Sequence, residues 1–249
     1  MKISVITVCY NSARTVERTL QSVAEQDWPT VEHIVIDGGS TDGTREILEK
    51  SQSQLTYLVS EPDKGIYDAM NKGLALATGD IVCFLNSDDK YASADVLSSV
   101  ASQMSDHNLE ALIGDVGFFR EGNITRMVRR YRSERFHPEL LGWGWMPAHP
   151  ALFLRAEVIQ RVGQFKTNYR IAGDFEFIVR VFHRQTISFR HFPLVLVHMQ
   201  TGGVSDGGWR AKINLNKEVL RACRENGLDT NMLKILSKYP AKLMELFHR

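Results

Sequence analysis

The sequence predicts an α/β protein with a mostly parallel, doubly wound sheet flanked by helices, followed by a C-terminal helical extension. Two observations in the first half support this class. Short apolar runs rich in β-branched residues alternate with segments whose apolar residues recur every three or four positions. Several of these runs end in polar turns that contain glycine or aspartate. Strands separated by helices of this length must cross back over the sheet, which favours parallel pairing.

The first half yields its elements in a regular order. Short apolar runs predict strands over Ile3–Val8, Glu32–Ile36 and Leu55–Val59, and from Ile81 onward. Helical spacing fills the intervals between them. The expected helices are one capped at Asn11 and Ser12 that runs through Glu25, a short one with Ile47 and Leu48, and one over Ile66–Ala77.

The second half is less regular. Residues 136–150 show no clear period, and 121–123 form a turn between two strand patterns. The expected elements are a helix over Ala94–Met104, strands over Ala111–Phe119, Ile124–Arg130 and Pro193–Val197, and helices over Asp174–His183, Trp209–Asn226 and Asn231–His248, the last interrupted by Pro240. Because no linker or repeat separates these segments, we expect one domain with a C-terminal helical extension.

Composition excludes several classes of protein. The chain has 249 residues, 43% of them hydrophobic, so it can bury a sizeable core. A net charge of +1 gives no general electrostatic reason for nucleic-acid binding. The three cysteines are odd in number and share no metal spacing, which indicates buried thiols in a reducing compartment. Without a signal peptide or an apolar run of membrane-spanning length, we expect a cytosolic protein, with contact to a membrane surface left open.

The strand that starts at Ile81 runs directly into two adjacent carboxylates, Asp88 and Asp89. A parallel sheet binds ligands beyond the carboxyl ends of its strands. Two carboxylates at such a place repel each other unless a positive group lies between them, and a divalent ion that holds a pyrophosphate fits this requirement. The alternative is a solvated turn after a strand, since Asn, Ser and Asp are common turn residues.

Two other predicted strands also end in polar residues. Asn11 follows the first strand and Asp37 ends the second. Each has a local alternative, a helix cap for Asn11 and an Asx-turn for Asp37. Because the carboxyl ends of parallel strands share one edge, we expect residues 7–11, Asp37 and Asp88–Asp89 to line one crevice.

Three segments resemble the family 2 inverting glycosyltransferases with the GT-A fold: Ser4–Asn11, Ile36–Thr44 and Asn86–Asp89. The resemblance covers residues 1–205 and is closest to enzymes that build bacterial polysaccharides, including the colanic-acid type. It implies transfer of a sugar from a nucleotide-diphosphate sugar to a hydroxyl of a growing saccharide, which is expected to be lipid-linked. It also implies a nucleotide-binding half over residues 1–110, an acceptor half over 111–205 and an extension over 206–249.

The same resemblance implies a donor-binding set. Residues 63–73 match the segment that closes over the base and ribose, and Asp37 matches the contact to the base. For Lys64 and Asp68, an exposed helix start is the alternative. The implied set is Thr7, Tyr10, Asn11, Asp37, Lys64, Asp68, Asn71 and Asp88.

A divalent metal, Mn²⁺ or Mg²⁺, is implied as the cofactor, with Asp89 as its main protein ligand. The family motif usually carries acids at its first and third places, but Ser87 fills the first place here. A late histidine completes the metal shell in related enzymes, which selects His198; neutral imidazole is an acceptable ligand for manganese. The alternative for His198 is a strand-end histidine bonded to backbone.

The catalytic base is implied by residues 172–177, which match the family segment that deprotonates the acceptor hydroxyl. The family often has two acids in succession; this chain has Gly173 and then Asp174, so Asp174 is the expected base. A helix cap is the alternative for Asp174. Trp143 and Trp145 are expected to stack on a sugar in a mobile acceptor loop, with ordinary core tryptophans as the alternative, and His149 is expected to line the acceptor or donor pocket.

The C-terminal residues 231–249 mix apolar and basic side chains. Such a helix can lie on an anionic membrane, here the inner face of the plasma membrane, or pack on the domain or a second subunit. The sequence does not determine the oligomeric state. A competing function is a non-catalytic nucleotide-sugar sensor or scaffold. A nucleotidylyltransferase or a dehydrogenase would need a glycine-rich turn after the first strand, and residues 10–14 contain no glycine.

Overall fold

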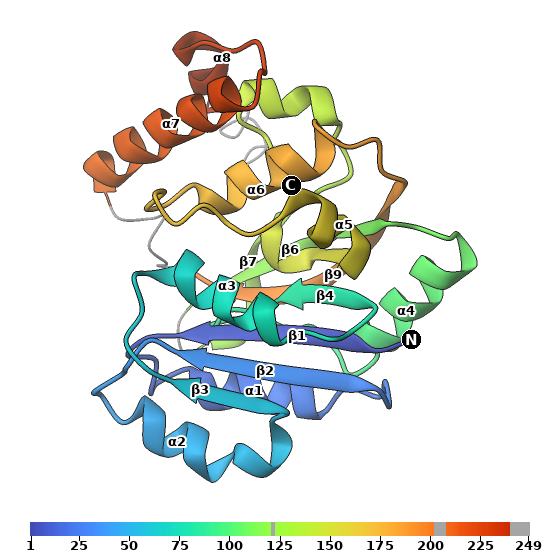
Figure 1. Cartoon of the computed structure of the whole chain (residues 1–249), viewed down its shortest axis with the longest axis vertical. Coiled ribbons are helices and arrows are strands. Elements are labelled where there is room, and N and C mark those ends of the chain that lie inside the picture. Colours follow the sequence, from blue (N-terminus) through green and yellow to red (C-terminus); the bar gives the residue numbers. More distant parts are fainter. Residues whose placement is uncertain (121–122, 202–207, 240–249) are drawn as a thin grey trace.

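The computed structural model describes residues 1–120, 123–201 and 208–239. The described residues form one nine-stranded sheet in the order β3-β2-β1-β4-β8-β6-β9-β5, with β7 paired to β6 (Figure 1). The strands are β1 (Ile3–Cys9), β2 (Val31–Asp37), β3 (Tyr57–Ser60), β4 (Ile81–Phe84), β5 (Lys90–Tyr91), β6 (Ala111–Arg120), β7 (Asn123–Tyr131), β8 (Leu152–Arg155) and β9 (Phe189–Gln200).

Helices cover both faces of this sheet, which confirms the α/β prediction (Figure 1). The α-helices are α1 (Val16–Ala24), α2 (Thr44–Lys50), α3 (Ile66–Leu76), α4 (Val96–Asp106), α5 (Ala156–Val162), α6 (Gly173–Phe182), α7 (Gly208–Glu225) and α8 (Met232–Leu236). Short 3₁₀-helices are η1 (Gln52–Gln54), η2 (Pro138–Trp143) and η3 (His149–Ala151).

Strand direction decides where a ligand can bind. β1, β2, β3 and β4 pair in parallel, and β8 is antiparallel to both β4 and β6, so β6 and its parallel partner β9 run in the direction of β1. β5, β7 and β8 run the other way. Six strands therefore bring their carboxyl ends to one edge, the expected position of a ligand site.

The central strand β1 is buried along its whole length because both of its faces are covered. Alternate residues point to opposite faces. Ile6 and Val8 pack in a core with α3, α6 and α7, while Ile3 and Val5 pack in a second core with α4. A third, smaller core joins β1 to α1 and α2.

Several boundaries differ from the sequence prediction. α1 begins at Val16 with Thr15 at the N-cap, so Asn11 and Ser12 do not cap it. The short elements β5, β8 and α5 escaped prediction because a two-residue strand and four-residue apolar runs give too little periodicity to recognise.

Residues 136–150, expected as an irregular mobile loop, instead contain η2 and η3, and Leu141 within η2 is fully buried. The predicted turn at 121–123 lies partly outside the described residues. So does most of the predicted helix over Asn231–His248: α8 ends at Leu236, and 240–249 are not described. Among the described helices, none combines the length and apolar character needed to span a bilayer.

Candidate active site

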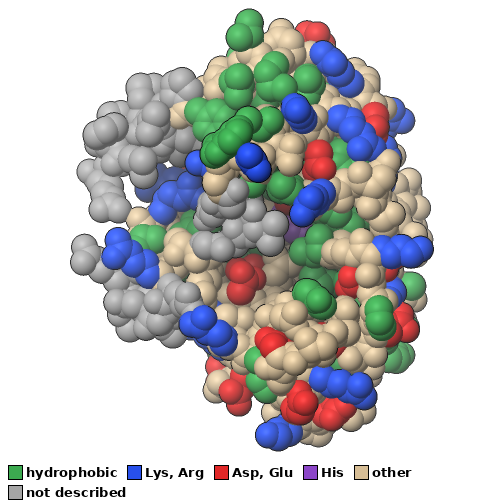
Figure 2. Space-filling model, turned by 90° about the vertical axis from the view of Figure 1, so that its left-hand side faces the viewer, with side chains coloured by type: hydrophobic (Ala, Val, Ile, Leu, Met, Phe, Trp, Pro, Cys, Tyr) green, Lys and Arg blue, Asp and Glu red, His purple; other side chains and the backbone are tan. Residues whose placement is uncertain are grey.

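The loops that follow β1, β2 and β4 are hydrogen-bonded to one another at the carboxyl edge of the sheet. The backbone N–H of Asn11 donates to Ser40 Oγ (2.8 Å), and Asn11 Oδ1 accepts from the backbone N–H of Thr41 (3.0 Å). Ser87 Oγ donates to Ser12 Oγ (2.8 Å). Figure 2 looks onto this edge and shows acidic and histidine side chains near the middle of a hollowed face. The structure thus brings together the three sequence segments that carried the resemblance.

Asp37 ends β2 with a fully buried side chain. Its carboxylate accepts hydrogen bonds from the backbone N–H of Ser40 (3.1 Å) and from Ser60 Oγ (2.7 Å), so the predicted Asx-type turn is present. Gly38 allows the turn to approach the loop after β3, because a Cβ there would lie 2.3 Å from Asp63 Oδ2. A contact from Asp37 to the nucleotide base stays a prediction.

The other two β1-edge residues differ in exposure. Tyr10 is 64% exposed at the edge, whereas the Thr7 side chain is fully buried. Thr7 Oγ1 lies 3.0 Å from His33 Nε2, and burial lowers the pKa of His33 to about 3, so this imidazole is neutral. The Thr7 side chain therefore serves the contact between β1 and β2.

The segment from Lys64 to Asn71 begins α3. The Lys64 backbone N–H donates to Asp68 Oδ2 (3.1 Å), and Lys72 forms an ion pair with the same carboxylate (3.9 Å). Both polar atoms of the Asn71 amide bind the backbone of Phe165, at 2.9 and 2.8 Å. Asp68 is thus held within the start of α3, the Lys64 side chain is exposed, and Asn71 ties α3 to the loop before α6.

Asp89 is fully buried, yet neither of its carboxylate oxygens has a hydrogen-bond partner among the described residues. Burial, followed by the neighbouring Asp88 carboxylate, raises the pKa of Asp89 well above its usual value. Burial also raises the pKa of Asp88. Asn86 Oδ1 is a further buried oxygen without a partner in the described chain. Buried carboxylates are ordinarily paired or bound to metal, so this arrangement fits a cation.

His198 joins Asp89 through strand pairing. β5 places Lys90, the residue after Asp89, directly opposite His198 of β9. Burial, then the Lys90 charge, lowers the pKa of His198 to about 4, so the ring is neutral at pH 7. Within the described residues its Nδ1 is buried and unpaired, which removes the alternative of a backbone-bonded histidine at that nitrogen. A neutral imidazole nitrogen can ligate a metal.

The residues present therefore fit a divalent ion, although they would not enclose one alone. Across the described part of the chain, no three His, Cys, Asp or Glu side chains gather into a metal-binding group. Mg²⁺ and ions like it are commonly held by one or two carboxylates plus substrate phosphates. Asp89 with His198 matches such an open site.

Asp174 lies in the first turn of α6, with Ala172 rather than Asp174 at the N-cap. Its Oδ1 accepts from the backbone N–H of Phe175 (2.7 Å). Burial raises the pKa of Asp174 to about 6, partly offset by backbone N–H groups and the Tyr67 hydroxyl. The carboxylate is thus ionised at pH 7 while staying a better proton acceptor than an ordinary aspartate.

The Tyr67 ring explains why this chain has glycine at position 173, where the resembled family often has an acid. A Cβ on Gly173 would lie 2.6–2.8 Å from the Tyr67 ring, so no larger side chain fits. Tyr67 belongs to the first turn of α3, and its hydroxyl donates to the carbonyl of Ile171 (2.7 Å). Because α3 starts from the loop after β3, this contact holds the N-terminus of α6, with Asp174, at the carboxyl edge.

The three expected acceptor residues separate in space. His149 is buried, stacks on Phe84 at the end of β4 (centroids 5.3 Å apart), and its Nε2 lacks a partner in the described residues. Burial lowers the pKa of His149 to about 4. Trp143 is 43% exposed and lines a cavity of about 520 Å³ with Phe182 at the far end of α6. Trp145 is half-buried between them in sequence.

Sequence reasoning missed Arg18, whose guanidinium donates to the Asp88 carbonyl (3.0 Å) and to Gln200 Oε1 (3.1 Å). It therefore joins α1, the acidic motif and the end of β9. It also missed Tyr67 and Glu218, whose side chains form hydrogen bonds with the backbone of residues 170–172. None of the three has a local sequence signal, because their partners lie far along the chain.

Comparison with known sequences gives a consistent result. Residues 4–166 match the sequence model of the family described as Glycosyl transferase family 2. An uncharacterized glycosyltransferase from Mycobacterium tuberculosis is 35% identical over 179 residues, which cover 72% of this chain and 68% of that protein. A "PGL/p-HBAD biosynthesis glycosyltransferase" from Mycobacterium bovis is 30% identical over 208 residues, covering 82% and 78%.

Among solved structures, the mannosyltransferase PcManGT from Pyrobaculum calidifontis, in complex with GDP-Man and Mn²⁺, superposes with a TM-score of 0.65. The match covers 92% of this chain and 65% of that one at 22% identity. At this identity the likeness establishes a shared mixed α/β fold.

Proposed function

This chain belongs to glycosyl transferase family 2, and we propose that it transfers a sugar, with inversion, from a nucleotide-diphosphate sugar to a saccharide hydroxyl. One observation carries the proposal. Among the described residues, both carboxylate oxygens of the buried Asp89 lack a hydrogen-bond partner, and so does Nδ1 of His198 on the strand paired with the following residue, Lys90. A folded protein leaves such groups unpaired when a ligand pairs with them.

The donor is expected to lie across the carboxyl edge of the sheet. Tyr10, Asn11 and Asp37 would border the nucleoside, and Lys64 and Asp88 the ribose and phosphates. Exposure of Tyr10 and Lys64 on this edge supports these roles. PcManGT is described with GDP-Man, which supports a nucleotide sugar as the donor class.

Asp89 and His198 would hold Mn²⁺ or Mg²⁺, and the complex of PcManGT with Mn²⁺ supports such a cofactor. When bound, the ion neutralises charge that develops on the departing diphosphate. The protein's own part is to present the buried Asp89 carboxyl group and to keep His198 neutral at neutral pH.

Asp174 would act as the base. Its carboxylate accepts the proton of the acceptor hydroxyl while that oxygen forms the new bond to the anomeric carbon. The bond from this carbon to the diphosphate oxygen breaks, and its electron pair leaves with the nucleoside diphosphate. Attack from the face opposite the leaving group inverts the anomeric configuration. A pKa of about 6 suits a base that works near neutral pH.

We place this reaction in glycan assembly, with a lipid-linked saccharide as the acceptor and a cytoplasmic site at the inner membrane face. The M. bovis relative is named for PGL/p-HBAD biosynthesis, which supports a role in glycan synthesis. Apolar side chains exposed on α7 and α8, among them Trp209 (68%) and Leu233 (80%), support contact with a membrane. Flotation with anionic liposomes tests the contact; protein left wholly in the soluble fraction would contradict it.

A donor screen tests the proposed reaction. Thermal shift is measured for UDP-, GDP- and dTDP-sugars with and without Mn²⁺, and the donor that stabilises the protein is then assayed for hydrolysis and transfer. Asp174→Asn should keep the thermal shift and lose at least about 100-fold in turnover. A wild-type protein that binds donor but never hydrolyses or transfers it would indicate a sensor instead.

A further inference from the structure

A carboxylate from the C-terminal extension accepts hydrogen bonds from the backbone immediately N-terminal to the proposed base. Glu218 of α7 accepts hydrogen bonds from three consecutive backbone N–H groups: those of Arg170 (2.9 Å), Ile171 (2.8 Å) and Ala172 (2.8 Å). Both carboxylate oxygens take part. Hydrogen bonds to a charged acceptor are shorter and stronger than neutral ones, so this is a firm attachment.

Residues 170–172, which Glu218 binds, lead directly into α6. Ala172 is the N-cap of α6 and Asp174 lies two residues further on. On the other side of the same segment, the Tyr67 hydroxyl of α3 donates to the Ile171 carbonyl (2.7 Å). Residues 170–172 are therefore held through their N–H groups by α7 and through a carbonyl by α3.

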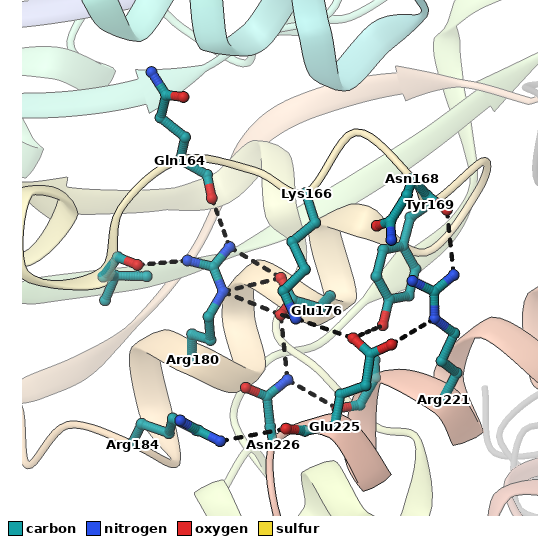
Figure 3. A network of polar contacts seen from close by, with 12 residues as sticks. Gln164, Lys166, Asn168, Tyr169, Glu176, Arg180, Arg184, Arg221, Glu225 and Asn226 are labelled. Carbon is teal, nitrogen blue, oxygen red and sulfur yellow. Dashed lines mark hydrogen bonds and ion pairs between the residues drawn. The ribbon is translucent and has the colours of Figure 1, made fainter.

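Another acidic residue of α7, Glu225, contacts the part of the loop that precedes residues 170–172. Figure 3 shows Glu225 binding Lys166, Tyr169 and Arg221, at 2.9, 3.0 and 2.6 Å. Lys166 also pairs with the buried Glu176 of α6 (2.9 Å). These contacts fix the loop to α6 and α7 through side chains, whereas the Glu218 carboxylate binds the backbone N–H groups of 170–172.

We infer that Glu218 is a positioning residue: it sets the location and the charge environment of Asp174, and so makes α7 a working part of the transfer site. This inference rests on the proposed role of Asp174 as the base. The family match ends at residue 166, so Glu218 lies outside the part of the chain that the family match covers.

Charge supports the geometry. The groups that face Asp174 are the Phe175 N–H on its own helix, the Tyr67 hydroxyl from α3 and Glu218 from α7. After burial, which is the main cause, the Glu218 charge adds to the raised pKa of Asp174, while three donors, the backbone N–H groups of Phe175 and Asp174 and the Tyr67 hydroxyl, lower it. Removing the Glu218 charge should lower the pKa of Asp174, because the aspartate anion then meets less repulsion.

Two measurements on the full chain test this without a known donor. Hydrogen exchange followed by mass spectrometry should show residues 170–172 exchanging at least about tenfold faster in Glu218→Gln, because charge-assisted bonds to their N–H groups are lost. Aspartate labelled with ¹³C at the carboxyl carbon reports the Asp174 titration, its signal identified by its loss in Asp174→Asn. The midpoint should move to lower pH in Glu218→Gln.

Glu225→Gln is the matched control, since Glu225 lies on the same helix but binds side chains only. It should leave both exchange at 170–172 and the Asp174 midpoint as in the wild type. Should Glu218→Gln fail to fold, Glu218→Asp keeps the charge but is too short to reach all three N–H groups, and exchange at 170–172 should still accelerate. Unchanged exchange and an unchanged midpoint, or equal effects from Glu225→Gln, would overturn the inference.

Turnover separates this inference from the proposed function. With the donor selected in the thermal-shift screen, Glu218→Gln should lose about ten- to hundredfold in kcat with little change in donor KM, because the base and not the donor site is displaced. If Asp174→Asn stays active, the assignment of the base fails whatever Glu218→Gln does. If Asp174→Asn is inactive while Glu218→Gln equals the wild type, only the inference on Glu218 fails.

Discussion

Asp89 places a carboxylate in a fully buried position without a donor to either oxygen in the described residues. Such a group opposes folding, since an unsatisfied buried acceptor costs about 1–3 kcal/mol and a charged one more. The neighbouring acid Asp88 adds repulsion. A site that is costly in the free protein and matched by a cation in the complex is typical of a residue kept for function.

Asp89→Asn should therefore stabilise the protein without metal, by about 1–3 kcal/mol, because it removes the unpaired charge. The same change should abolish any rise in Tm on adding Mn²⁺ with donor. Thermal unfolding with and without Mn²⁺ measures both. Asp63→Asn, a change at an acid of the same edge outside the proposed metal pair, is the control. A less stable Asp89→Asn protein that still responds to Mn²⁺ would contradict the metal site.

The pH dependence of turnover belongs to Asp174. Its pKa is raised by burial to about 6, and the base must be ionised, so kcat should rise through about pH 6 and level off above it. Below that value the rate should fall about tenfold per pH unit. The residual activity of Asp174→Asn should lack this limb. A limb that persists unchanged in Asp174→Asn would assign it to another group.

At the scale of elements, the start of α6 depends on the first turn of α3. The Tyr67 ring packs against Gly173, and its hydroxyl binds the Ile171 carbonyl. The Tyr67 ring of α3 thus fills the space that a side chain at position 173 of α6 would occupy, and this forms a contact between the two helices. This explains in physical terms why a residue other than glycine is excluded directly before the proposed base.

Gly173→Ala should displace the start of α6, because its Cβ would meet the Tyr67 ring at 2.6–2.8 Å. We expect a loss of about 1–3 kcal/mol in unfolding free energy, typical of overpacking, together with reduced turnover. Urea denaturation and steady-state kinetics measure these effects. Adding Tyr67→Ala should recover part of the stability lost through Gly173→Ala; strictly additive losses would contradict the clash.

At the scale of the whole molecule, α7 and α8 belong to the main core. Val219, Ala222 and Cys223 of α7 and Ile235 of α8 pack, fully or nearly buried, in the cluster that includes Ile6 of β1. α7 contacts α6, and α8 contacts both α7 and η2. Packing on the domain, one of the two interpretations of the C-terminal pattern, therefore holds for the described part of that pattern.

Two α8 residues of similar size, one buried and one exposed, allow the contribution of core packing to be compared with that of the surface. Ile235 is fully buried and Leu233 is 80% exposed. Ile235→Ala should cost about 2–5 kcal/mol because it leaves a cavity, whereas Leu233→Ala should stay within about 0.5 kcal/mol. Denaturant unfolding measures both changes. Equal, small losses would mean that α8 contributes little to the core.

The sequence predicted the parallel half of the sheet well, because β1, β2 and β4 and their helices have strong local periodicity. It also selected Asn11, Asp37 and Asp89, since polar residues after strands must meet at one edge. The acceptor roles of Trp143, Trp145 and His149 stay predictions. The structure puts His149 against Phe84 and Trp143 in a cavity at the far end of α6.

By itself, the sequence determined the order of the longer strands and helices, the family and the acids available for chemistry, because these depend on local patterns and short motifs. Tertiary structure alone decided which of those acids lack hydrogen-bond partners among the described residues and which accept hydrogen bonds within a turn. It also decided that Tyr67 and Glu218 hold the segment that leads to Asp174. Burial and pairing depend on residues far along the chain, such as Tyr67 and Ile171, which are 104 positions apart, and no local pattern encodes such contacts.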